Sequence, residues 1–108
     1  MPRGVAVFSI ATRQLCFALG TEIGRARRER RWSQAELAGR VGVSVGTVRA
    51  VESGAPSVTL GVAFEAAQVL GLVLMGGPDV AAARAAESRR VMQLLPQRVR
   101  SVSVDDDF

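Results

Sequence analysis

The side chains that could do chemistry in this chain are hydrogen-bond donors that lie close together in the sequence. Gln34 carries an amide, Thr47 a hydroxyl and Arg49 a guanidinium group. Such groups bind phosphates and the edges of nucleic-acid bases, and they break no bonds by themselves. His and Tyr are absent, and Cys16 is the only cysteine. We therefore expect a binding protein, not an enzyme, with no metal site and no cofactor.

Two short helices must position these donors, and residues 34–53 have the pattern of both. Leu37 and Val41 lie four residues apart, on one face of the first helix. Ala38 is small enough to let a second helix cross, and Gly42 suits the left-handed backbone of a turn. In the second helix, Val48 and Val51 form the buried stripe. The outward face of that helix carries Val45, Gly46, Thr47, Arg49 and Ala50.

The ends of these helices are also marked in the sequence. Ser33 is followed three residues later by Glu36, which is the spacing of a capping box. Ser44 is placed to cap the second helix, and Gly54 follows its last residues as a stop. Both helices are therefore bounded by sequence signals.

These residues resemble the lambda repressor and Cro type of helix-turn-helix domain, also called the XRE family. The resemblance covers roughly residues 19–74 and rests on SQAELA, the Gly42 turn and VESG. Within that family the chain is most similar to HipB-like antitoxins. The features that carry this likeness are Trp32 before Ser33 and Gln34, the segment VTLGVAFEAAQVLGL and the apolar LVLM that follows it.

The resemblance implies binding to the major groove of double-stranded DNA, with Gln34 on the DNA backbone. The residues at positions 45, 46 and 50 would face base edges, but here they are apolar or very small. Base recognition would then depend on thymine methyl contact, Thr47 and Arg49, and Arg49 would bind either guanine or phosphate. The predicted DNA-binding residues are Arg28, Gln34, Ser44, Val45, Gly46, Thr47, Arg49 and Ala50.

The resemblance also places Arg27 and Glu52 where a salt bridge joins the first helix to the end of the recognition helix. The alternative is that both are separate exposed charges.

The charge balance favours a polyanionic partner. The chain has 108 residues, enough for one small domain, and a formal net charge of +4. Arginine supplies all of its basic side chains, and seven arginines but only two glutamates lie between Arg25 and Arg49. This cluster indicates either a nucleic-acid surface or simply the solvated face of a helix. The sequence shows neither a membrane span nor a convincing signal peptide, so we expect a cytoplasmic protein.

The predicted fold is all-α, a lambda-repressor-like domain of four to five helices with a short C-terminal strand and an additional helix. Residues 1–18 form an N-terminal extension, 19–75 the DNA-binding domain and 76–108 a helical arm with a disordered acidic tail. The first helix would begin near Thr12 or Leu19, and VAVFSIA before it is either a strand or a disordered leader. A fourth helix capped by Thr59 would end at Gly71. Its predicted buried stripe is Leu60, Ala63, Phe64, Ala67 and Leu70.

The apolar run after Gly71 is too short for a helix and predicts a buried strand. It consists of Leu72, Val73, Leu74 and Met75. A strand needs a partner edge, so pairing with a second copy would make a homodimer, as the resemblance also implies. The alternatives are an apolar loop on the core and pairing with VAVFSIA.

The C-terminal third combines an Ala-rich helix with a charge-segregated tail. We expect a helix over residues 79–95, capped by Asp79 and stopped by Pro96. The tail at residues 97–108, which is basic and then acidic, is either disordered or a tag that binds a partner. The whole sequence predicts a homodimeric DNA-binding repressor, an antitoxin-like autoregulator with a HipA-like kinase toxin as its partner. The alternatives are a stand-alone XRE-family regulator and a protein-interaction module that has lost DNA binding.

Overall fold

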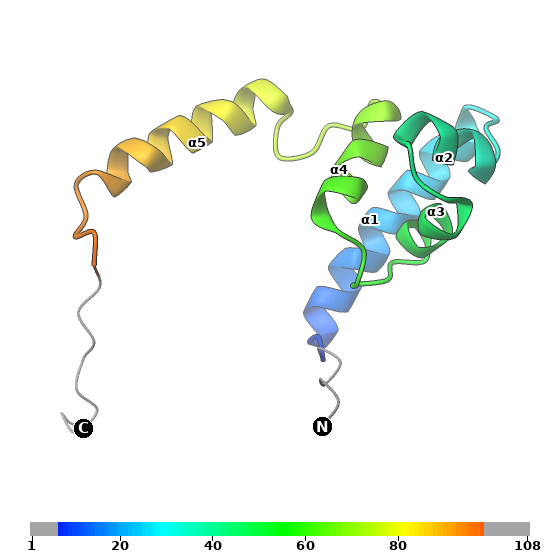
Figure 1. The fold of residues 1–108 in the computed structure, drawn as a ribbon, viewed down its shortest axis with the longest axis horizontal. Coiled ribbons are helices and arrows are strands. Elements are labelled where there is room, and N and C mark those ends of the chain that lie inside the picture. The colour runs from blue at the N-terminus through cyan, green and yellow to red at the C-terminus, as the bar shows by residue number, and fades with distance from the viewer. Residues whose placement is uncertain (1–6, 99–108) are drawn as a thin grey trace. The chain divides into compact units, whose positions relative to one another are not determined.

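The computed structural model describes residues 7–98, and these form five helices and no strand (Figure 1). The described residues divide into two compact units, 7–74 and 75–98. The helices are α1 (Ile10–Glu29), α2 (Gln34–Val41), α3 (Val45–Glu52), α4 (Leu60–Val69) and α5 (Pro78–Met92).

Helix α1 begins earlier than either predicted start, because Ser9 caps it. The Ser9 hydroxyl accepts a hydrogen bond from the Thr12 backbone amide at 3.1 Å. The second half of the expected extension is therefore helical. Of the VAVFSIA segment, Ile10 and Ala11 belong to the helix and not to a strand, and its first two residues lie outside the described part of the chain.

The caps of α2 and α3 lie where the sequence places them. Ser33 and Glu36 form both bonds of the capping box, at 3.0 and 2.7 Å. Gly42 ends α2 in the left-handed conformation, with φ 86° and ψ 34°. The Ser44 hydroxyl caps α3 by accepting from the Thr47 amide at 3.1 Å. The turn between the two helices is thus fixed by local interactions.

The core of the first unit lies among α1 to α4: α1 packs against α3, and α2 packs against α3 and α4. Of the predicted buried stripe of α4, Ala67 and Leu70 are buried and Ala63 and Phe64 are half-buried, whereas Leu60, the first residue of the helix, is 70% exposed. Thr59 occupies the N-cap of α4 but its side chain makes no capping bond. The buried apolar side chains are Ile23, Ala26, Leu37, Ala38, Val48, Val51, Ala66, Ala67 and Leu70.

The predicted strand at residues 72–75 is not seen. The Leu72 backbone N–H donates to Ala67 O at 2.9 Å. The next two residues, Val73 and Leu74, have no regular secondary structure. A strand requires a neighbouring edge, and the described part of this single chain offers none. Val73 is 74% exposed, and Met75 has a positive φ of 52°.

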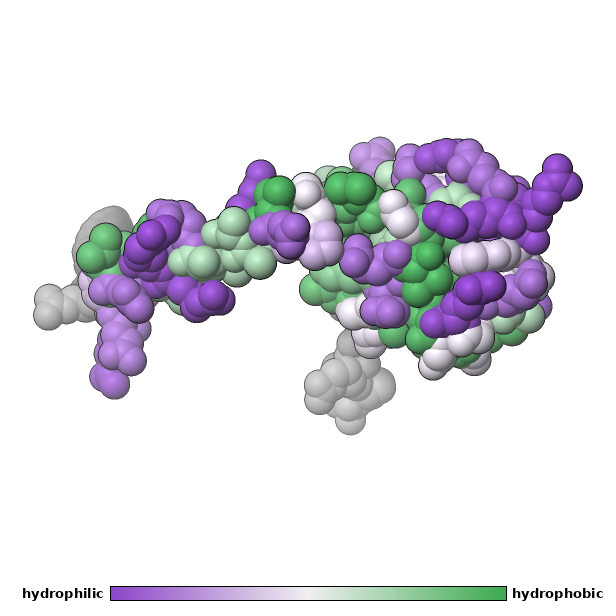
Figure 2. Space-filling model, turned by 90° about the horizontal axis from the view of Figure 1, so that it is seen from above, coloured by the Kyte–Doolittle hydropathy of each residue, from purple (hydrophilic) through white to green (hydrophobic). Residues whose placement is uncertain are grey.

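The second unit contains α5, which has no buried residue. Its N-cap is Gly77 and not the predicted Asp79, since Pro78 takes the first helical position and places Asp79 in the first turn. The helix ends at Met92, short of the predicted residue 95. Hydrophilic and hydrophobic residues are mixed along it (Figure 2). The predicted acidic tail lies outside the described residues.

Candidate nucleic-acid interface

The outward side of α3 is the surface that the sequence predicts to meet DNA. Ser44, Gly46 and Arg49 are exposed, whereas Thr47 and Ala50 are half-buried. Val45 is also half-buried, and it packs against the core instead of facing fully outward. The exposed residues on this side of α3 thus include one long polar side chain, that of Arg49.

Thr47 is less available than the sequence suggests. Its hydroxyl lies 3.0 Å from the Ser44 hydroxyl, which also accepts from the Thr47 amide. Both side chains therefore contribute to the cap of α3, and each has only its remaining hydrogen-bonding capacity for a ligand.

Arg27 and Glu52 lie in contact across the interface between α1 and α3. Arg27 Nε donates to Glu52 Oε2 at 2.6 Å, and Arg27 Nη2 donates to Glu52 Oε1 at 3.0 Å. Both side chains are only 9% exposed. The third guanidinium nitrogen, Nη1, donates to the Trp32 carbonyl at 2.8 Å. Every nitrogen of the buried guanidinium thus has an acceptor, and Arg27 joins α1 to the end of α3 and to the Trp32 carbonyl.

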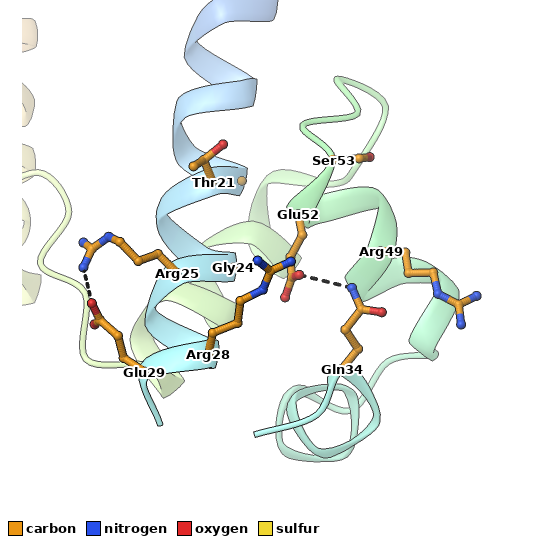
Figure 3. Close-up of a pocket in the computed structure, with 10 residues that line it drawn as sticks. Thr21, Gly24, Arg25, Arg28, Glu29, Gln34, Arg49, Glu52 and Ser53 are labelled. Carbon is orange, nitrogen blue, oxygen red and sulfur yellow. Dashed lines mark hydrogen bonds and ion pairs between the residues drawn. The ribbon is translucent and has the colours of Figure 1, made fainter. Parts of the chain in front are cut away.

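The Glu52 carboxylate also holds Gln34. The Gln34 amide nitrogen, Nε2, donates to Glu52 Oε1 at 3.1 Å (Figure 3). Burial alone would raise the pKa of the Glu52 carboxyl. The hydrogen bonds from Arg27 and Gln34 and the nearby positive charges together lower it by more than burial raises it, so the pKa lies below its usual range. The carboxylate is therefore ionised whenever this network is formed at neutral pH.

A groove runs between α1, the start of α2 and the end of α3, and three arginines line it (Figure 3). Arg25 is turned to its own helix, where Glu22 and Glu29 accept from it at 3.0 and 2.7 Å. Arg28 and Arg49 are exposed and have no ion pair within the part of the chain that the structure describes. Arg49 extends away from Glu52. Arg28, Arg49 and Gln34 thus form a set of donors suited to an anion.

Two glycines of α1 make this arrangement possible, and the sequence analysis missed them. A Cβ at Gly20 would lie 2.3 Å from Val51 O and 2.8 Å from Glu52 O, so only glycine lets α1 approach the last turn of α3. A Cβ at Gly24 would lie 3.3 Å from Glu52 Oε1, so Gly24 leaves room for the carboxylate. The four-residue spacing of these glycines on one helix face was the available signal.

The described residues hold no cluster of three or more His, Cys, Asp or Glu side chains that could bind a metal ion. None of the described helices is both long and apolar enough to cross a membrane. Cys16 is a free, half-buried thiol.

Comparison with known proteins gives one match. No curated protein and no solved structure is significantly similar to the chain. A family model described as helix-turn-helix matches residues 23–73, which span the described helices from within α1 to just past α4, and this match suggests a DNA-binding transcription regulator.

Proposed function

We propose that the chain is a sequence-specific DNA-binding repressor that acts as a homodimer. The observation that carries the proposal is the groove beside α3, where Arg28, Arg49 and Gln34 present donors next to the exposed face of that helix. Gln34 is also the first residue of α2, so a phosphate that meets its amide would lie near the positive end of the helix dipole. Phosphate contacts set the register, and the small face of α3 would approach the major groove.

Specificity then depends on few side chains. Gly46 and Ala50 offer no hydrogen bonds, so contact with thymine methyl groups and with Arg49 would supply most of the discrimination between bases. The same small, weakly polar face also favours a second candidate function, a protein-interaction module that keeps the fold without binding DNA.

The dimer is supported by the segment after α4. The backbones of Val73 and Leu74 make no backbone–backbone hydrogen bond within the described residues, and Val73 is 74% exposed. A second copy of residues 72–75 would supply the missing ladder and cover the exposed side chains.

The antitoxin role, with a HipA-like kinase toxin as partner, rests on the likeness of the segments around Trp32 and after α3 to HipB-like proteins. Co-purification of the chain with the kinase of a neighbouring reading frame would support that role, and its failure would leave a stand-alone regulator. Because the proposed ligand is DNA, we place the protein in the cytoplasm.

The test of the central proposal is salt-dependent binding to a duplex of the chain's own upstream DNA, followed by fluorescence anisotropy. Arg28→Ala and Arg49→Ala should each weaken binding and shrink the salt slope by about one. Arg25→Ala is the matched control, because its guanidinium is already engaged by Glu22 and Glu29. Of the three variants, Arg25→Ala should change the affinity for DNA least. If the wild-type protein binds no DNA even at low salt, the interaction module becomes the better explanation.

A further inference from the structure

The inference concerns the orientation of the Gln34 amide, and it rests on the proposed function. We propose that Glu52 is a positioning residue for DNA binding: it holds the Gln34 amide so that the second N–H of that amide faces a phosphate. Glu52 would not touch DNA itself. It would fix the Gln34 side chain in one position and leave one amide N–H for the phosphate.

The argument starts from the chemistry of the two groups. An amide has a donating end and an accepting end of nearly the same shape, whereas an ionised carboxylate only accepts. With Nε2 at 3.1 Å from Glu52 Oε1, the amide nitrogen faces the carboxylate and the amide oxygen lies on the opposite side, toward Arg49 (Figure 3). One Nε2 proton is used by Glu52 and the other is free. An amide that rotated by half a turn would place its oxygen against the ionised carboxylate, which repels it, so Glu52 fixes the observed orientation.

Glu52 can hold the amide because it is itself held. Arg27 binds both carboxylate oxygens, and Gly24 leaves space where a side chain would lie 3.3 Å from Oε1. Arg27 also binds the Trp32 carbonyl, two residues before Gln34 in the chain. One network therefore ties α1, the start of α2 and the end of α3, so that Gln34 is fixed relative to the helix that meets the bases. Fixing the side chain in advance lowers the entropy cost of binding.

The test asks whether the contribution of Gln34 depends on Glu52. We would measure the affinity of four proteins for a mixed-sequence duplex of about 20 base pairs, since a phosphate contact requires no particular sequence. The proteins are the wild type, Gln34→Ala, the paired replacement Arg27→Met with Glu52→Leu, and all three changes together. The paired replacement removes the acceptor without leaving a buried charge, and such apolar swaps are often tolerated.

We expect Gln34→Ala to weaken binding about tenfold in the wild-type background, as for loss of a hydrogen bond to a charged group, and less than about twofold in the paired background. An equal loss in both backgrounds would overturn the positioning role. No loss in the wild-type background, with DNA still bound, would overturn the inference alone. Absence of DNA binding by the wild type would instead overturn the proposed function.

A second measurement does not depend on how the paired replacement folds. In the wild-type protein, one of the two Gln34 side-chain amide protons should exchange with solvent more slowly than those of the exposed Gln14 and Gln68. The NMR signals of the Gln34 amide protons are identified by their absence from the spectrum of the Gln34→Ala protein. Exchange as fast as that of the other two glutamines would show that Glu52 does not hold the amide.

Discussion

Replacing Gly20 by Ala tests the close approach of α1 and α3 on which the whole interface depends. The added Cβ would lie 2.3 Å from Val51 O, 2.8 Å from Glu52 O and 3.0 Å from Gly54 N. All three are backbone atoms, so no side chain can rotate away and the two helices must separate. Separation would also pull Arg27 away from Glu52.

The expected change in the free energy of unfolding of the Gly20→Ala protein is the sum of two opposing contributions. Overpacking costs typically about 1–3 kcal/mol, and contact with three backbone atoms places this change near the upper end. Alanine gains about 1 kcal/mol over glycine in a helix interior. We therefore expect a net loss of about 2 kcal/mol, which in a small domain lowers the melting temperature by roughly 8–16 °C.

Gly39→Ala is the matched control, because a Cβ at Gly39 in α2 meets no atom within 4 Å. This variant should gain up to about 1 kcal/mol and melt roughly 4–8 °C higher. Thermal unfolding, followed by circular dichroism and by the fluorescence of Trp32, measures both proteins. A Gly20→Ala protein that is as stable as the Gly39→Ala protein would refute the close approach of α1 to α3.

Three further outcomes are expected. Because the folded state lowers the pKa of Glu52, the stabilisation from its ion pair is fully present above the unfolded value of about 4.3 and is lost as the pH falls through the lower folded value. In urea unfolding between pH 2 and 6, the free energy of unfolding should therefore fall less with decreasing pH for the Arg27→Met/Glu52→Leu protein than for the wild type. The same dependence on pH in both proteins would contradict the lowered pKa of Glu52. A chain ending at Gly71 should sediment as a monomer, whereas one ending at Gly77 should remain a dimer; a dimer from the shorter chain would exclude residues 72–75 as the interface. Arg49→Ala should either relax preference at one base pair, at a cost of about 1–3 kcal/mol, or weaken all sequences equally, and selection from a randomised DNA pool distinguishes these cases.

The local features of the fold could be predicted because they depend on neighbouring residues. Ser33, Glu36, Gly42 and Ser44 act within one helical turn, and the structure confirms their caps and turn. The end of α4 is equally local: the helix ends at Val69, and Gly71, just after the C-cap residue Leu70, has a φ of 73°.

What the sequence could not supply are the contacts between residues far apart in the chain. The bond from Gln34 to Glu52 spans 18 residues, and the fit of Gly20 against the end of α3 depends on how two helices cross. A cluster of basic residues likewise does not reveal which are available. Arg25 and Arg27 belong to that cluster, but one is paired on its own helix and the other is buried. The prediction of a strand at residues 72–75 was wrong for this single chain for a different reason. The residues are apolar as the pattern requires, but a strand needs a second strand edge with which to form hydrogen bonds.

The small number of available cations bears on why two copies would be needed. With Arg27 buried and Arg25 paired, Arg28 and Arg49 are the arginines of the groove that are left to neutralise phosphates. Two neutralised phosphates would give a salt slope of about −1.8 for one copy and about −3.6 for two copies. Joining two half-sites in one ligand then raises the affinity without any new contact. If the proposed interface binds DNA, we therefore expect tight binding to require two copies of the chain. The salt slope of the wild-type protein, compared with that of the chain ending at Gly71, measures this dependence directly.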